Sequence, residues 1–129
     1  MPSTVDRTFR AHPSSLFEVR QFIRGCAAQA GLDGAFADDI VLAVSEASAN
    51  SVLHTNGPEF TVTLSIRDGC VHVDVSDRGV FNRRVVIPER DGHGRGIPLM
   101  KAMMDQVSIR EGTEVSPGTR VRLVKCGGG

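Results

Sequence analysis

Residues 45–79 read SEASANSVLHTNGPEFTVTLSIRDGCVHVDVSDRG, and this stretch decides the fold. It begins inside a helical segment that carries Glu46 and Asn50, which lie four residues apart. Asn56-Gly57-Pro58 ends that segment, and two strand-like runs follow on either side of the hairpin turn Asp68-Gly69. A helix joined directly to a hairpin predicts an α/β structure, in which the helix covers one face of a sheet.

The two runs of the hairpin alternate apolar and polar residues, which is the pattern of half-buried strands. Their apolar positions are Phe60, Val62, Leu64 and Ile66 in the first run and Val71, Val73 and Val75 in the second. Asp77 has the parity of the valines, so the pleat is predicted to direct its carboxylate toward the buried side. A buried carboxylate needs hydrogen-bond donors, because an unpaired buried charge costs several kcal/mol.

The N-terminal part of the chain predicts a strand and a helix. Val5 to Ala11 is expected to form an edge strand. Pro13-Ser14-Ser15 marks the start of a helix, where Glu18 completes a capping box with Ser15, and Gly31 marks its end. The apolar residues at helical spacing are Leu16, Val19, Phe22, Ile23 and Cys26.

A second helix is expected from near Phe36 to about His54. Its apolar stripe consists of Ile40, Ala43, Val44 and Ala47. At about 100° per residue, Glu46 and Asn50 fall on the flank of that stripe and not on the opposite, solvated side.

The rest of the chain predicts a loop, a helix and two strands. The loop runs from Val80 to Asp91, the helix from Gly96 to Asp105, and the strands from Val107 to Arg110 and from Gly118 to Lys125. Pro98 is tolerated in the first turn of such a helix. Together the elements predict one domain over residues 1–129, a two-layer α/β sandwich whose mixed, mostly antiparallel sheet is covered by helices on one face.

The composition is ordinary for a globular protein and argues against several function classes. Lys plus Arg equals Asp plus Glu at 15 each, so no global field favours nucleic acid or a membrane surface. There is no Trp or Tyr for base stacking, no signal peptide, and no apolar run near the roughly 20 residues of a membrane span. Three scattered cysteines, Cys26, Cys70 and Cys126, predict neither a disulfide framework nor a zinc site, which favours a reducing cytoplasm.

Glu46 and Asn50 share one helical face and are candidates for phosphate chemistry. An amide oxygen is a good ligand for Mg²⁺, which binds through one or two protein groups together with phosphates and water. A nearby carboxylate can accept a proton from a water or hydroxyl that attacks a γ-phosphate. The alternative is that both are ordinary residues of a helix surface.

Three further segments are candidates for a nucleotide site. Asp77 would accept a hydrogen bond from the exocyclic amino group of a purine, and Gly79 would let the ring approach the backbone; the alternative is a loop-capping aspartate. Gly92-His93-Gly94-Arg95-Gly96, ahead of a helix, either presents backbone N–H groups to phosphates or is a flexible linker. Gly118-Thr119 on its own indicates a hairpin turn.

In their order along the chain, these segments resemble the sequence boxes of the Bergerat-fold ATPases, which include histidine kinases, gyrase-type ATPases and Hsp90. Glu46-Ala-Ser-Ala-Asn50 resembles the N box, Asp77-Arg-Gly79 the G1 box, Gly92-His-Gly-Arg-Gly96 the G2 box, and Gly118-Thr119 the G3 position. The compact length and short lid look most like the anti-sigma-factor serine kinases of bacterial sporulation and stress response. The resemblance covers nearly the whole chain.

The resemblance implies a role for each candidate residue. Asn50 would coordinate Mg²⁺ and Glu46 would be the catalytic base. Asp77 would bind the adenine amino group, with Thr119 helping through a water. The G2 residues would bind the phosphates beneath a mobile lid, and they are Gly92, His93, Gly94, Arg95 and Gly96.

The resemblance also implies an activity and partners. Family members transfer the γ-phosphate of ATP to a serine of an anti-anti-sigma (STAS-type) protein and sequester a sigma factor, typically as homodimers. A cytoplasmic Mg-ATP-dependent protein serine kinase is therefore expected; the alternative is a regulatory binding module without phosphotransfer. Phe81 departs from the family pattern, because a second glycine is common there, and it would narrow the pocket or stiffen the lid hinge.

Overall fold

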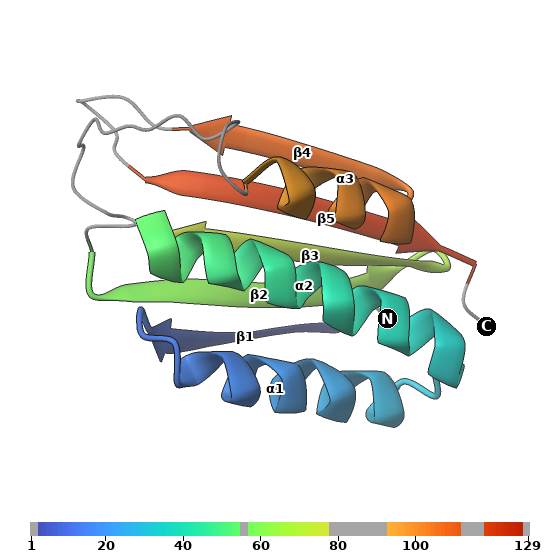
Figure 1. Cartoon of the computed structure of the whole chain (residues 1–129). Coiled ribbons are helices and arrows are strands. Elements are labelled where there is room, and N and C mark those ends of the chain that lie inside the picture. Colours follow the sequence, from blue (N-terminus) through green and yellow to red (C-terminus); the bar gives the residue numbers. More distant parts are fainter. Residues whose placement is uncertain (1–2, 55–56, 78–92, 112–117, 128–129) are drawn as a thin grey trace.

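The computed structural model describes residues 3–54, 57–77, 93–111 and 118–127. The elements are β1 (Ser3–Arg10), α1 (Ser15–Gln29), α2 (Gly34–His54), β2 (Glu59–Arg67), β3 (Cys70–Asp77), α3 (His93–Met103), β4 (Gln106–Glu111) and β5 (Thr119–Cys126). The described strands form one sheet in the order β1-β2-β3-β5-β4, and each of these neighbouring pairs is antiparallel. The helices lie on one face of it, with α1 beside α2, and α3 over β5 and β4 (Figure 1). The predicted two-layer α/β sandwich is confirmed.

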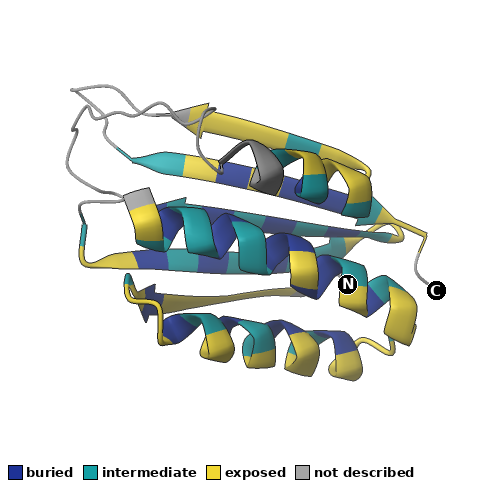
Figure 2. Cartoon of the chain, viewed as in Figure 1, coloured by how far each residue is buried: buried dark blue, intermediate teal, exposed yellow. Residues whose placement is uncertain are grey.

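The core lies between the sheet and the helices. Buried positions alternate along β2 and β3, and the helices α1 and α2 carry buried parts next to exposed ones (Figure 2). The predicted apolar stripe of α2 is buried throughout, as are the three valines of β3. Phe60 of β2 stacks on Phe9 of β1, with 5.6 Å between the ring centroids. The central strands and α2 therefore form a rigid base for side chains at their ends.

Two predicted details of the helices are wrong. The capping box does not form: the N-cap of α1 is Ser14, which makes no side-chain cap hydrogen bond. Its backbone is in the right-handed helical region, and its hydroxyl pairs instead with Nδ1 of His12 at 2.9 Å. In addition, α3 begins at His93 and not at Gly96, so Pro98 lies in its second turn and not in its first.

The expectation that the cysteines form no disulfide is also wrong. Asp68 and Gly69 both adopt positive φ, 53° and 76°, and make the tight hairpin turn that the sequence predicted. The turn places Cys70 at the start of β3, directly opposite Cys126 at the end of β5, and the two sulfurs are bonded at 2.03 Å. Cysteines 56 positions apart meet only through the non-local pairing of β3 with β5, which no cysteine spacing reveals.

No helix in the described ranges is both long enough and apolar enough to cross a bilayer.

Candidate functional site

Asp77 is the last residue of β3, and its side chain is 8% exposed, as the parity of the strand predicted. Its Oδ2 atom accepts a hydrogen bond from Oγ of Ser51 at 3.4 Å. In the sheet, Asp77 lies opposite Phe60 of β2 and Thr119 of β5. The carboxylate is therefore enclosed where three strands and the C-terminal part of α2 meet.

Glu46 and Asn50 are half-buried on α2, which agrees with the flank position that the sequence predicted. Asn50 directly precedes Ser51, the residue whose hydroxyl contacts Asp77. Glu46 lies about one helical turn before Asn50, on the same side of the helix. The N box therefore ends at the same end of the sheet as the buried carboxylate.

Several elements bring the candidate segments to this end of the molecule. The C-terminal part of α2, the end of β3 and the start of β5 lie together, and α3 begins toward the same side (Figure 1). Because α3 begins at His93, Gly94 and Gly96 are in its first turn, where backbone N–H groups have no partner within the helix. Such groups, at the positive end of the helix dipole, suit a phosphate.

Part of the predicted site lies outside the described residues. Gly79, Gly92 and the predicted lid from Val80 to Asp91, with Phe81, fall there. The side chains of His93 and Arg95 are also outside the described part of the chain.

Ser51 is the residue of this site that the sequence did not single out. A serine beside an asparagine carries no motif of its own. The helical pattern does contain a signal, because Ser51 follows Val44 and Ala47 at spacings of seven and four and so continues the buried stripe of α2. A polar residue on a buried stripe needs a hydrogen-bond partner, and here the partner is Asp77.

The side chains present fit an adenine nucleotide with Mg²⁺. A buried carboxylate is an acceptor for an exocyclic amino group, and the Thr119 hydroxyl on the neighbouring strand can share a water with it. Asn50 supplies one amide oxygen. Within the described ranges, no three His, Cys, Asp or Glu side chains are grouped to hold a metal ion. Mg²⁺ takes few protein ligands and completes its shell with phosphate oxygens and water, so a single amide oxygen from Asn50 is compatible with it.

Residues 9–125 match the family model of the histidine kinase-like ATPase domain. The chain therefore belongs to the histidine kinase-like ATPase family, and the resemblance that the ordered boxes indicated is confirmed.

Similar curated proteins carry the name anti-sigma F factor. The protein from Geobacillus stearothermophilus is 35% identical over 104 residues, and the match covers 68% of each chain. The protein from Geobacillus sp. (strain WCH70) is 34% identical over 100 residues, with 67% of each chain covered. The protein from Clostridium acetobutylicum is 26% identical over 100 residues, with 68% of each chain covered.

A solved structure shares the fold. The RsbU and RsbW domains of Rv1364c from Mycobacterium tuberculosis match with a TM-score of 0.74 at 23% identity, over 96% of this chain and 32% of that chain. The chain thus spans about a third of the length of that larger protein.

Proposed function

We propose that this chain is a Mg-ATP-dependent protein serine kinase that acts as an anti-sigma factor. It binds a sigma factor and phosphorylates a serine of an anti-anti-sigma (STAS-type) protein. The observation that carries the proposal is the buried carboxylate of Asp77, held by Ser51 beside the N box, in a chain of the histidine kinase-like ATPase family. Relatives named anti-sigma F factor support the regulatory role.

In this proposal Asp77 recognises the adenine amino group, and Asn50 contributes an oxygen to Mg²⁺. Gly92, Gly94 and Gly96 present backbone N–H groups to the phosphates at the start of α3, with His93 and Arg95 beside them. When bound, ATP would supply the phosphoryl group, and Mg²⁺ would neutralise the negative charge of the phosphates.

Glu46 acts on the substrate protein. Its carboxylate would accept the proton of the serine hydroxyl as that oxygen attacks the γ-phosphorus of ATP and ADP leaves, which is the contribution of a general base. The half-buried position of Glu46, one helical turn from Asn50, supports this role. A carboxylate in that place is held in position by the helix α2.

The partners and setting follow from the same proposal. A sigma factor and an anti-anti-sigma protein act in the cytoplasm, so the chain is proposed to act there too. It is proposed to be a homodimer. Neither a membrane nor direct contact with nucleic acid is part of the proposal.

The test is transfer of phosphate to protein. The full chain is mixed with Mg-ATP and the anti-anti-sigma proteins encoded near its gene, and phosphoserine is measured by mass spectrometry. Wild type is expected to modify one serine of its cognate partner, whereas Glu46→Gln is expected to lose at least ~100-fold of the rate with ATP affinity changed by less than about threefold. Glu18→Gln, at an exposed position of α1, is the matched control.

Transfer by Glu46→Gln at the wild-type rate would contradict the role of the base. Binding of ATP and of the partner without phosphoserine in wild type would favour the regulatory binding module.

A further inference from the structure

The end of the sheet opposite the candidate site carries the disulfide between Cys70 and Cys126. The two cysteines are a directly opposed pair, with Cα atoms 4.0 Å apart. The next pair along is hydrogen-bonded, because the Gly127 N–H donates to the Gly69 carbonyl at 3.0 Å. The cysteines therefore occupy a non-hydrogen-bonded position of the ladder, where facing side chains approach most closely.

This disulfide lies on the face of the sheet that the helices leave open. Cys70 has the parity of His72 and Asp74, which are not part of the core, and Cys126 is exposed at the end of β5. Cys70 is half-buried. The bond therefore lies at the surface, outside the core, with Cys126 as its more exposed half.

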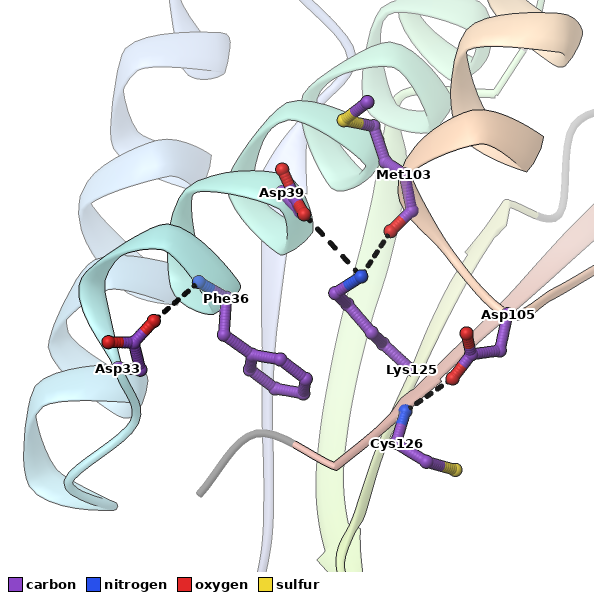
Figure 3. A network of polar contacts seen from close by, with 7 residues as sticks. All are labelled: Asp33, Phe36, Asp39, Met103, Asp105, Lys125 and Cys126. Carbon is purple, nitrogen blue, oxygen red and sulfur yellow. Dashed lines mark hydrogen bonds and ion pairs between the residues drawn. The ribbon is translucent and has the colours of Figure 1, made fainter.

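A network of polar contacts next to Cys126 ties the end of β5 to the helices (Figure 3). Nζ of Lys125 donates to the carbonyl of Met103 at 2.8 Å, at the C-terminus of α3, and lies 3.4 Å from the carboxylate of Asp39 on α2. The N–H of Cys126 donates to Oδ2 of Asp105 at 2.7 Å, just before β4. We call these five residues the β5 junction.

The β5 junction depends on the last residues of the strand staying paired. Ends of terminal strands open more readily than their centres, because few contacts hold them. The disulfide links the end of β5 to the β2–β3 hairpin. It therefore also stabilises the hydrogen bond from Lys125 to Met103 at the C-terminus of α3. The other end of α3, its N-terminal turn, contains Gly94 and Gly96 of the candidate site.

We propose that Cys70–Cys126 is a redox site that acts as a latch on the β5 junction, opened by a dithiol and closed again by a disulfide oxidant. This inference does not depend on the proposed kinase function. A disulfide that is exposed and lies outside the core is more readily reduced than a buried structural bond, which suits a regulatory role.

The chemistry of opening is thiol–disulfide exchange. A thiolate of the dithiol attacks Sγ of Cys126, the S–S bond breaks, and Sγ of Cys70 leaves as a thiolate that takes up a proton. The second thiol of the dithiol then attacks the mixed disulfide and releases Cys126. Two electrons pass to the protein, which ends with two thiols, and the dithiol ends as an intramolecular disulfide. An oxidised dithiol or a disulfide such as oxidised glutathione reverses these steps.

The test uses the full chain with Cys26→Ser, which removes the remaining free cysteine. Burial raises the pKa of the Cys26 thiol, against a smaller opposite effect of Arg7. This thiol is therefore a weak nucleophile. Because it takes no part in the exchange, its removal leaves the chemistry of the latch unchanged. Iodoacetamide labelling followed by mass spectrometry is expected to give no label after oxidised glutathione and two labels after dithiothreitol, without denaturant.

Thermal melting and hydrogen exchange then measure what the latch does. Reduction is expected to lower the melting temperature by on the order of 10 °C, because the disulfide closes a long loop. It is also expected to speed exchange of the Asp105, Cys126 and Gly127 amides at least tenfold, with the Ala11 amide, which donates to Pro58 at the other end, much less affected.

Cys70→Ser with Cys126→Ser, in the same background, is the control that has no latch. It is expected to melt at the temperature of the reduced protein and to show no response to dithiothreitol. If these two serines prevent folding, the reduced parent protein gives the same comparison. Two labelled cysteines after oxidised glutathione, no reaction with dithiothreitol in the folded state, or equal melting temperatures of oxidised and reduced protein would overturn the proposal.

Discussion

At the scale of single residues, the burial of Asp77 is the feature that most constrains function. A carboxylate at the edge of a core is retained at a cost in desolvation, and the hydrogen bond from Ser51 at 3.4 Å is one of the interactions that offset this cost. The amino group of a bound base would be a further donor to this carboxylate. An acceptor in this place is compatible with the proposed recognition of a base.

Asp77→Asn is expected to weaken Mg-ATP binding at least tenfold, since a hydrogen bond to a charged acceptor contributes about 1.5–3 kcal/mol. Isothermal titration calorimetry on the folded variant measures the change. The matched control is Asp74→Asn on the same strand, whose carboxylate lies on the open face and pairs with Arg122. Unchanged affinity in Asp77→Asn, or an equal loss in both variants, would exclude the adenine role.

Sequence alone placed Asp77 correctly because a strand fixes the side of each residue by parity. It did not place Ser51, because the partner of a helix residue depends on which strand lies under that helix. It also could not place the lid residues, since Val80 to Asp91 have no periodic pattern. The roles of Glu46, Asn50 and the G2 glycines remain predictions.

At the scale of elements, the contact between β5 and α3 illustrates how the sheet holds a helix. Lys125 is a residue of the inner face of β5, and only 17% of its side chain is exposed. Its ammonium group caps the carbonyl of Met103 at the C-terminus of α3 and lies 5.4 Å from the ring centroid of Phe36. A cation in this place also complements the negative end of the helix dipole.

Lys125→Met keeps most of the buried stem but removes the charge. It is expected to lower the free energy of unfolding by about 1.5–3 kcal/mol, the range for a hydrogen bond to a charged group. Arg24→Met is the control, because the Arg24–Asp38 pair is half exposed on both sides, and a loss below about 1 kcal/mol is expected there. Urea denaturation compares the two, and a smaller effect for Lys125→Met than for Arg24→Met would contradict the anchoring role.

The elements themselves were largely predictable, and their ends were not. Strong alternation gave β2 and β3, and the apolar stripe gave α2 to within a few residues. The start of α1 at Ser14 and Ser15 was predicted correctly, but the capping box of Ser15 with Glu18 was not, because the N-cap residue is Ser14 and its hydroxyl pairs with His12. The start of α3 was predicted too late, because the glycines before Gly96 suggest a loop, whereas the helix begins at His93 and packs against α2.

At the scale of the whole molecule, the core is a single layer of side chains between one sheet and its helices. Phe60 is 1% exposed and stacks on Phe9, and the ring of Phe9 also packs edge to face against Phe22 of α1. This aromatic cluster joins β1, β2 and α1. It therefore supports the strand end opposite Asp77 as well as the packing of the first helix.

Phe60→Ala is expected to lower the free energy of unfolding by about 3–5 kcal/mol, the usual cost of a large cavity in a packed core. Phe17→Ala serves as the control with the same change in side chain, because Phe17 is 59% exposed on α1, and about 0.5 kcal/mol or less is expected. Thermal and urea unfolding followed by circular dichroism measure both. Equal losses in the two variants would contradict the assigned core.

The disulfide could not be predicted from the sequence. An odd number of scattered cysteines predicted free thiols, and Cys26 is free. Cys70 and Cys126 are brought together by a strand order in which β5 inserts between β3 and β4, and such an order follows from the packing of the whole chain.

Recognition of adenine by Asp77 is tested most directly by calorimetric titration of the full chain with Mg-ATP and, separately, with Mg-GTP. Guanine carries an oxygen acceptor where adenine carries the amino donor, so a buried carboxylate would face a carbonyl with no hydrogen between them. The expected result is binding of Mg-ATP at least tenfold tighter than Mg-GTP. Equal affinities for the two nucleotides, or no binding of Mg-ATP, would contradict it.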